Sequence, residues 1–225
     1  MDPKSLKTTV KQRIIIIAAA VLLLGSTIIT YVAIVASNGG SGSSTSELED
    51  KYTDKQAEIN SYAATLSEQY FPTFASFRSE VKAYNAAAAN STGVHTRDLL
   101  EGTGRELATG DLEYYAYYIG FCPDESIFDS SFNDSANPTQ LNAPIYAGQG
   151  LIEGWNVGVV GMKIGGVREI QMPGEQAYGD SREICGTTNS PLKFIVMAVE
   201  DSKLSELNNE LEEIYGELVN RYYNQ

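Results

Sequence analysis

Residues 151–172, LIEGWNVGVVGMKIGGVREIQM, combine a helical pattern with a strand pattern. Ile152, Trp155, Val159 and Met162 recur at spacings of three, four and three, which is the period of a helix. A Gly165-Gly166 turn follows, and residues 167–172 then read as a strand. The stretch predicts one short helix joined by a tight turn to a strand.

The remainder of residues 95–201 reads mostly as strand. Residues 112–118 are rich in aromatic side chains, and residues 192–199 place Leu192, Phe194 and Val196 on one face. An antiparallel sheet packed on one short helix is the α+β arrangement that this order favours.

Eight motifs, in chain order, resemble those of the FKBP-type peptidyl-prolyl cis/trans isomerases. The resemblance covers roughly residues 94–201 and leaves the flanking segments aside. The motifs are DLLEGTG (98–104), ATGD (108–111), YIG (118–120), IFDSSF (127–132), LIEGW (151–155), GVVGMKIGG (158–166), AYG (177–179) and NSPLKF (189–194).

The resemblance implies a half-barrel sheet wrapped round the short helix, with an apolar pocket for a prolyl side chain. On the family pattern, Trp155 forms the floor, and the backbone N–H of Ile152 meets a substrate carbonyl. The implied catalytic side chains are Tyr118, Phe128, Asp129, Trp155, Tyr178 and Phe194. The implied substrate-binding positions are Leu151, Ile152, Ile184 and, at the aromatic rim position, Ile145 or Tyr146.

Such a site needs no nucleophile, acid–base pair, metal or cofactor. Rotation about an X-Pro bond meets a barrier of about 18–20 kcal/mol, because resonance gives the C–N bond double-bond character. The twisted transition state is less polar than the planar ground state, so a dry aromatic cage favours it. One His and two distant Cys also argue against a zinc site.

Residues 184–188, ICGTT, stand where the family usually has an apolar residue followed by Pro-Pro. In the family this loop and the segment after the YIG strand border the same pocket, and here they carry Cys185 and Cys122. The resemblance therefore suggests a disulfide that pins the loop, which an oxidising compartment permits. The alternative is two independent thiols.

Residues 14–36 are 23 consecutive residues without a charge, long enough to span a bilayer as a helix. Four basic residues precede them, so the positive-inside bias places a tail of residues 1–13 in the cytoplasm. Residues 37–45 then form a Gly/Ser tether, and the remainder lies outside the membrane. A cleaved signal peptide is the alternative, but its apolar region is shorter and ends in an A-x-A-like site.

Helical segments flank the central domain. Residues 46–93 show helical spacings, with Pro72 expected to end or kink the first helix, and residues 202–225 form an amphipathic helix. The seam of the second helix either docks on the first segment or joins two copies as a homodimer, and the sequence leaves both open. Its residues are Leu204, Leu207, Leu211, Ile214 and Leu218.

The chain has 16 basic and 29 acidic residues, which argues against nucleic-acid binding. The leading hypothesis is a membrane-tethered isomerase, in a bacterial setting, that assists the folding of exported or surface proteins. X-Pro polypeptides are the expected clients, and the resemblance adds macrolide inhibitors. The alternatives are a proline-peptide-binding chaperone with a weakly active pocket, and a structural surface protein in which the fold is a spacer.

Overall fold

The computed structural model describes residues 43–80, 93–111, 113–147 and 151–223. The chain forms two compact units: a helical unit, Met1–Ile59 with Lys203–Gln225, and a sheet unit, Asn60–Ser202. The predicted tail 1–13 and membrane segment 14–36 lie outside the described residues. Within the described ranges, no helix is both long and apolar enough to cross a bilayer.

Helix α3 (Ser43–Ala75) contributes to both units, and the 3-10 helix η1 (Ser76–Ser79) follows it. It begins three residues before the predicted start, so residues 43–45 are helical rather than part of the tether. Of the two expectations for Pro72, an end of the helix is excluded, because Pro72 lies inside α3, which continues to Ala75. The fully buried ring of Phe74 lies against Tyr117 and Phe132, and this packing stabilises the last turn.

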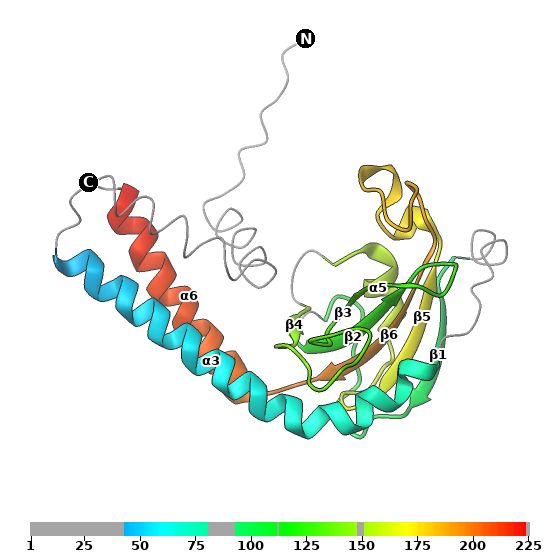
Figure 1. The fold of residues 1–225 in the computed structure, drawn as a ribbon, viewed down its shortest axis with the longest axis horizontal. Helices are drawn as coiled ribbons and strands as arrows, with labels where there is room; N and C mark the ends of the chain where they lie inside the picture. The colour runs from blue at the N-terminus through cyan, green and yellow to red at the C-terminus, as the bar shows by residue number, and fades with distance from the viewer. Residues whose placement is uncertain (1–42, 81–92, 112, 148–150, 224–225) are drawn as a thin grey trace, which may run out of the picture. The chain divides into compact units, whose positions relative to one another are not determined.

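In the helical unit, α3 and α6 (Ser202–Tyr223) run antiparallel (Figure 1). Leu48 and Tyr52 of α3 form a buried cluster with Leu218 of α6. Lys55 binds Glu210 at 2.5 Å, which raises the pKa of Lys55 to about 12. The seam of α6 therefore docks on α3 of the same chain, the first of the two arrangements expected. A homodimer stays a prediction.

The sheet unit contains six antiparallel strands in the order β1-β5-β6-β2-β3, with β4 also paired to β2 (Figure 1). Strands β5 and β6 have the predicted bounds, whereas β2 lies three residues beyond the predicted 112–118. Every residue of β2 pairs with β6, and this pairing fixes the bounds of β2 more strongly than aromatic content does. The strands are β1 (His95–Leu100), β2 (Tyr115–Phe121), β3 (Ile127–Ser130), β4 (Ile145–Tyr146), β5 (Val167–Met172) and β6 (Leu192–Val199).

Helix α5 (Glu153–Gly158) packs on β5 and is shorter than the predicted pattern from Ile152 to Met162. The last residue of α5 is Gly158, and close packing on β5 explains the glycine, because a Cβ there would lie 2.4 Å from Ile170 Cγ2. Arg168 of β5 secures this end by donating to the carbonyl oxygens of Gly158 and Val160 at 3.0 and 2.8 Å.

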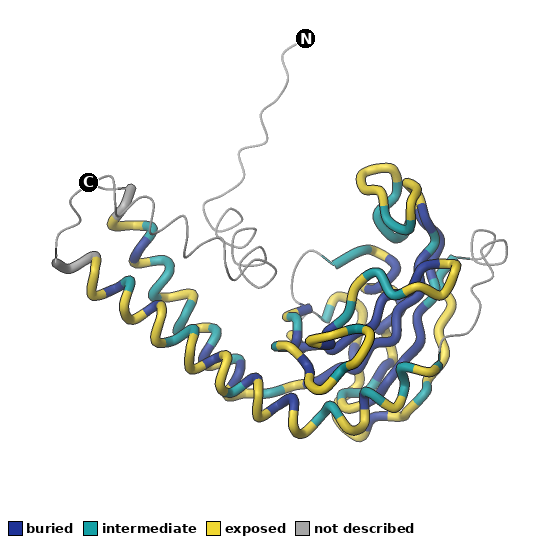
Figure 2. The backbone as a smooth tube through the Cα atoms, in the orientation of Figure 1, coloured by how far each residue is buried: buried dark blue, intermediate teal, exposed yellow. Residues whose placement is uncertain are grey.

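Both faces of the sheet are covered, although the sequence indicated only one apolar face. Every residue of β6 is buried, as Figure 2 shows for the central strands. Leu192, Phe194 and Val196 face the α5 side, which we call the inner face. On the outer face, Tyr70 and Phe74 of α3 lie on Tyr117, with ring centroids 5.8 and 6.3 Å apart.

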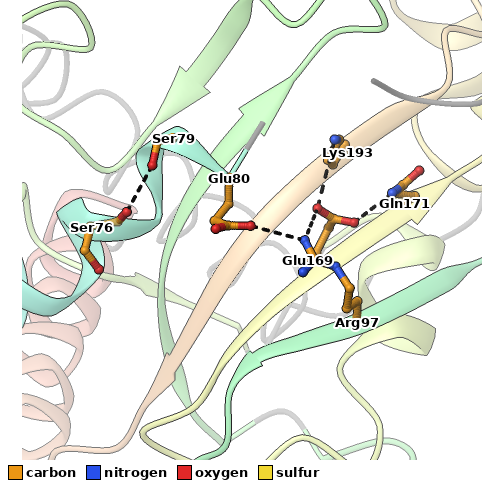
Figure 3. A network of polar contacts seen from close by, with 7 residues as sticks. All are labelled: Ser76, Ser79, Glu80, Arg97, Glu169, Gln171 and Lys193. Carbon is orange, nitrogen blue, oxygen red and sulfur yellow. Dashed lines mark hydrogen bonds and ion pairs between the residues drawn. The ribbon is translucent and has the colours of Figure 1, made fainter. Parts of the chain in front are cut away.

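A polar network also lies on the outer face (Figure 3). Glu169, only 4% exposed, accepts hydrogen bonds from Gln171 at 2.8 Å and Arg97 at 3.2 Å. Nζ of Lys193, 1% exposed, is 4.0 Å from the same carboxylate. Arg97 also binds Glu80, the residue after η1, at 3.4 Å. The network therefore links the end of η1 to β1, β5 and β6.

Candidate active site

Trp155 lies at the centre of an aromatic cluster on the inner face, which we call the aromatic site. It is 2% exposed, and its indole Nε1–H donates to the hydroxyl of Tyr114 at 3.0 Å. Burial raises the pKa of Tyr114 to about 12, so this hydroxyl stays protonated at neutral pH. The hydrogen bond satisfies the buried indole N–H and fixes the orientation of the ring.

Three more aromatic rings complete the cluster. Phe194 and Tyr118 meet Trp155 edge-on, with centroids 5.3 and 5.8 Å away, and Phe128 lies edge-on to Phe194 at 5.7 Å. Gly120 makes room for these rings, because a Cβ there would lie 2.7 Å from Phe128 Cζ and 3.1 Å from Phe194 Cε1. The structure thus brings together the four aromatic residues predicted for the floor and walls.

Asp129 and Tyr118 meet across the β2–β3 pair. The Tyr118 hydroxyl donates to Asp129 Oδ2 at 2.8 Å. Burial, and secondly the hydrogen bond and charge of Asp129, raise the pKa of Tyr118 well above its ordinary range. The hydroxyl is therefore a neutral donor at every physiological pH, and it holds the carboxylate beside the aromatic rings.

Tyr178 lies between the short helices η2 (Gly174–Gln176) and η3 (Gly179–Ser181) and packs half-buried against the aromatic site. The guanidinium carbon of Arg182 lies 5.2 Å from its ring centroid, a cation–π contact. Burial raises the pKa of Tyr178; the nearby Arg182 opposes this rise and the charge of Asp129 adds to it. The predicted polar residues Asp129 and Tyr178 are thus close enough to interact.

Cys122 and Cys185 form a disulfide with a Cα–Cα distance of 5.6 Å, which confirms the suggested pair over two independent thiols. Cys122 directly follows β2, and Cys185 belongs to the loop between η3 and β6. Ile184, the predicted substrate-binding residue of this loop, packs half-buried against the aromatic site. The altered loop is therefore fixed to the strand that carries Tyr118.

The N-terminal end of α5 completes the site. Leu151 and Ile152 pack against the aromatic cluster. Among the described residues, no backbone carbonyl pairs with the backbone N–H of Ile152, the donor that the resemblance assigns to a substrate carbonyl. Of the two rim candidates, Ile145 packs on the site, whereas Tyr146 is 39% exposed and its ring lies on Tyr115 of the outer face. Tyr146 thus points away from the aromatic site, because successive strand residues point to opposite faces.

Two residues that support the site were not predicted. Tyr114 is not among the predicted site residues, yet its hydroxyl accepts the indole N–H of Trp155 and orients that ring. Arg168 holds the end of α5 and also forms a bidentate pair with Asp98, at 2.6 and 3.0 Å. The need of a buried indole N–H for an acceptor is a signal that favours a tyrosine, but nothing in the sequence says which of the 14 tyrosines supplies it.

The described residues also include features away from the site. A groove of 490 Å³ lies between α3–η1 and the β2–β3 hairpin, and it contains none of the predicted site residues. Within the described ranges, no group of three or more His, Cys, Asp or Glu is arranged to hold a metal ion. His95 is exposed.

An antiparallel sheet with a short helix across it, an aromatic cluster under that helix and a Tyr–Asp pair beside it define an FKBP-type domain. The model of the family described as FKBP-type peptidyl-prolyl cis-trans isomerase matches residues 104–199. An FK506-binding protein of Neisseria meningitidis serogroup B is 39% identical over 87 residues, which are 39% of this chain and 75% of that protein. The chain belongs to the FKBP-type peptidyl-prolyl cis-trans isomerase family.

Other relatives are longer than the matched part. FK506-binding protein 4 of Chaetomium thermophilum is 36% identical over 110 residues, 48% of this chain but only 21% of that protein. The chain thus spans about a fifth of the length of this fungal relative. Among solved structures, FkpA from Escherichia coli is 22% identical, covers 86% of this chain and 73% of that one, and has a TM-score of 0.38.

Proposed function

We propose that this protein catalyses cis/trans isomerisation of X-Pro peptide bonds in polypeptide clients. The observation that carries the proposal is the aromatic site itself: Trp155, Phe194 and Tyr118 are 2%, 3% and 8% exposed, and Phe194 and Tyr118 meet Trp155 edge-on next to the backbone N–H of Ile152. The prolyl ring packs on Trp155, and the N–H of Ile152 binds a client carbonyl.

The chemistry required of the site is differential binding. A planar X-Pro amide has separated charge, which the twisted amide loses, so a dry aromatic surface stabilises the twisted state relative to the planar one. Lowering the barrier by about 4 kcal/mol accelerates rotation roughly a thousandfold. Because the Tyr118 hydroxyl stays protonated, the Tyr118 ring adds no charge of its own beside the prolyl amide.

We further propose that the domain acts outside a bacterial membrane, tethered through residues 14–36, on exported or surface proteins. The uncharged segment and the basic residues before it support the orientation. The Cys122–Cys185 bond supports an oxidising compartment, since disulfides persist there and are rare in the cytosol. Macrolides that bind FK506-binding proteins are proposed inhibitors.

Exchange NMR on an Ala-Leu-Pro-Phe peptide tests the activity, with the full chain in detergent micelles. We expect faster cis/trans exchange with the wild-type chain and a loss of about tenfold or more in the Asp129→Ala, Tyr178→Ala variant. Tyr117→Phe is the matched control, because Tyr117 lies on the outer face, and its exchange rate should equal that of the wild type.

An absence of acceleration, together with a change in Trp155 fluorescence on adding peptide, would replace the isomerase by a proline-peptide-binding chaperone. If neither acceleration nor a fluorescence change is observed, the domain would have only a structural role. Sedimentation of the same sample reports mass, and the mass of two chains would establish the predicted homodimer.

A further inference from the structure

The loop that carries Cys185 contains a tight turn of an uncommon kind. Ile184 and Thr187 exchange backbone hydrogen bonds, with N–O distances of 3.0 and 3.4 Å. The two residues between them, Cys185 and Gly186, have φ angles of 61° and 76°. Two central residues with positive φ make this a type I′ turn, in which Asn, Asp or Gly is preferred at the first central position.

Cysteine is an unfavourable residue at that position, because its Cβ opposes the left-handed conformation. The disulfide explains its presence, since Cys185 reaches Cys122 from there. Cys122 is a rigid anchor: it is 5% exposed, its N–H donates to Ser126 O and its C=O accepts from Glu125 N, both at 2.9 Å. The bond thus ties the tip of the turn to the β2–β3 hairpin.

The base of the turn is held separately. The buried hydroxyl of Ser190 lies 2.7 Å from Ile184 O and 3.1 Å from Thr187 O. Asn189 N donates to Gly179 O at 2.7 Å. Base and tip are therefore held by different residues, Ser190 at the base and the disulfide at the tip.

The disulfide also joins two sides of the aromatic site. The β2–β3 hairpin beyond Cys122 carries Phe128 and Asp129, and the loop carries Ile184 and follows Tyr178. Ile184 and Cys185 both pack against the cluster that contains Trp155. A loop already fixed in its bound position loses less conformational entropy when a ligand binds.

We propose that Cys122 and Cys185 are positioning residues for client binding: their bond presets the type I′ turn that holds Ile184 against the aromatic site. This proposal rests on the proposed isomerase function. The bond acts on affinity rather than on rotation, because Trp155, Tyr118 and Phe194, which favour the twisted amide, are held by Tyr114 and by the sheet.

The test compares KM and kcat by exchange NMR, with the full chain in detergent micelles and the Ala-Leu-Pro-Phe peptide at rising concentration. For the Cys122→Ser, Cys185→Ser variant we expect KM to rise about three- to tenfold, with kcat within about twofold of the wild type. Near-ultraviolet circular dichroism and thermal unfolding of each variant verify that the sheet unit is folded at the assay temperature.

Two further variants separate turn geometry from general loosening. With Cys122→Ser, the change Cys185→Asn should recover much of the lost affinity, since Asn adopts the left-handed conformation. The change Cys185→Val in the same background should recover none. Dithiothreitol, which gives two electrons and two protons to the bond and becomes a cyclic disulfide, should raise KM of the wild type but not of the double-serine variant.

A double-serine variant with unchanged KM, or with kcat reduced and KM unchanged, would overturn this proposal and leave the isomerase intact. Dissociation constants from Trp155 fluorescence give the second readout. If the oxidised wild type binds peptide without catalysis and the double-serine variant binds it several times more weakly, the isomerase is overturned and the positioning role stands. An oxidised wild type that neither binds nor catalyses would overturn both.

Discussion

Tyr117 and Tyr118 are neighbours in β2, yet their hydroxyl groups have opposite environments. The Tyr118 hydroxyl donates to Asp129 on the inner face. The Tyr117 hydroxyl is buried under α3 on the outer face and, among the described residues, has no hydrogen-bond partner. Successive side chains of a strand point to opposite faces of the sheet. A shift of one residue along β2 therefore separates a tyrosine hydroxyl that contacts the site from one that is buried under α3.

Replacing each tyrosine by phenylalanine separates these roles. Tyr118→Phe should lower kcat/KM by about tenfold, because it removes a hydrogen bond to a carboxylate beside the site. Tyr117→Phe should raise the free energy of unfolding by about 1 kcal/mol, since an unsatisfied buried hydroxyl disappears, and should leave kcat/KM unchanged. Urea unfolding and exchange NMR on both variants check this, and equal effects of the two changes would contradict it.

The buried tyrosines predict a loss of stability in alkali. Burial raises the pKa of Tyr114 from 10.0 to about 12, and raises the pKa of Tyr117 and Tyr118 further. Between pH 10 and these values the unfolded chain has lost protons that the folded chain keeps, so stability falls as pH rises. At pH 11 the three groups together should cost about 4 kcal/mol relative to pH 8.

Urea unfolding at pH 8 and pH 11, with tyrosinate absorbance near 295 nm, measures the effect. A Tyr114→Phe, Tyr117→Phe variant should lose about 3 kcal/mol less stability than the wild type on the same change of pH. Equal losses in the two proteins would assign the alkaline effect to other groups.

Glu169 should be a strong determinant of stability that does not affect catalysis. Glu169→Gln removes the negative charge that faces Arg97 and the buried Lys193, and we expect a loss of about 3 kcal/mol in the free energy of unfolding. Adding Lys193→Met should restore much of it, because the buried positive charge is then also gone. Guanidinium unfolding of both variants measures this, and a double variant no more stable than the single one would refute the pairing.

Two glycines should respond to alanine in opposite directions. Gly120→Ala places a Cβ 2.7 Å from the Phe128 ring and should cost about 1–3 kcal/mol, with reduced kcat/KM. Gly216, inside α6, has no neighbouring heavy atom within 4 Å of the place of its Cβ. Gly216→Ala should therefore stabilise α6 by about 1 kcal/mol. Thermal unfolding of each variant decides the signs, and exchange NMR checks that Gly216→Ala keeps full activity.

The sequence predicted those parts of the fold that are encoded locally. Val167 to Met172 and Leu192 to Val199 have the predicted bounds because the apolar composition of each segment is a local signal, and the Gly165-Gly166 turn directly precedes the first of them. The resemblance also placed Trp155 with Phe194 and Tyr118 correctly. The ordered set of motifs indicated that these residues share one site, because a residue spacing gives no information about positions so far apart in the sequence.

The remainder depends on contacts between distant segments. Tyr114 accepts the indole N–H of Trp155 from 41 residues away, and no local pattern indicates that pairing. The shift of β2 follows from its register with β6, and the burial of Lys193 follows from contacts on the outer face. The sequence left Ile145 and Tyr146 open as rim candidates, because only the strand's pleat decides which of two adjacent residues faces inward.

The covering of the outer face by α3 also has a practical meaning for anyone who wishes to isolate the isomerase domain. The compact sheet unit begins at Asn60, well before residue 94, where the family resemblance begins. A fragment that begins at residue 94 would lack Tyr70 and Phe74. Tyr117 and its neighbours would then form an exposed hydrophobic patch that favours aggregation. The N-terminal boundary of the sheet unit, Asn60, therefore lies inside helix α3.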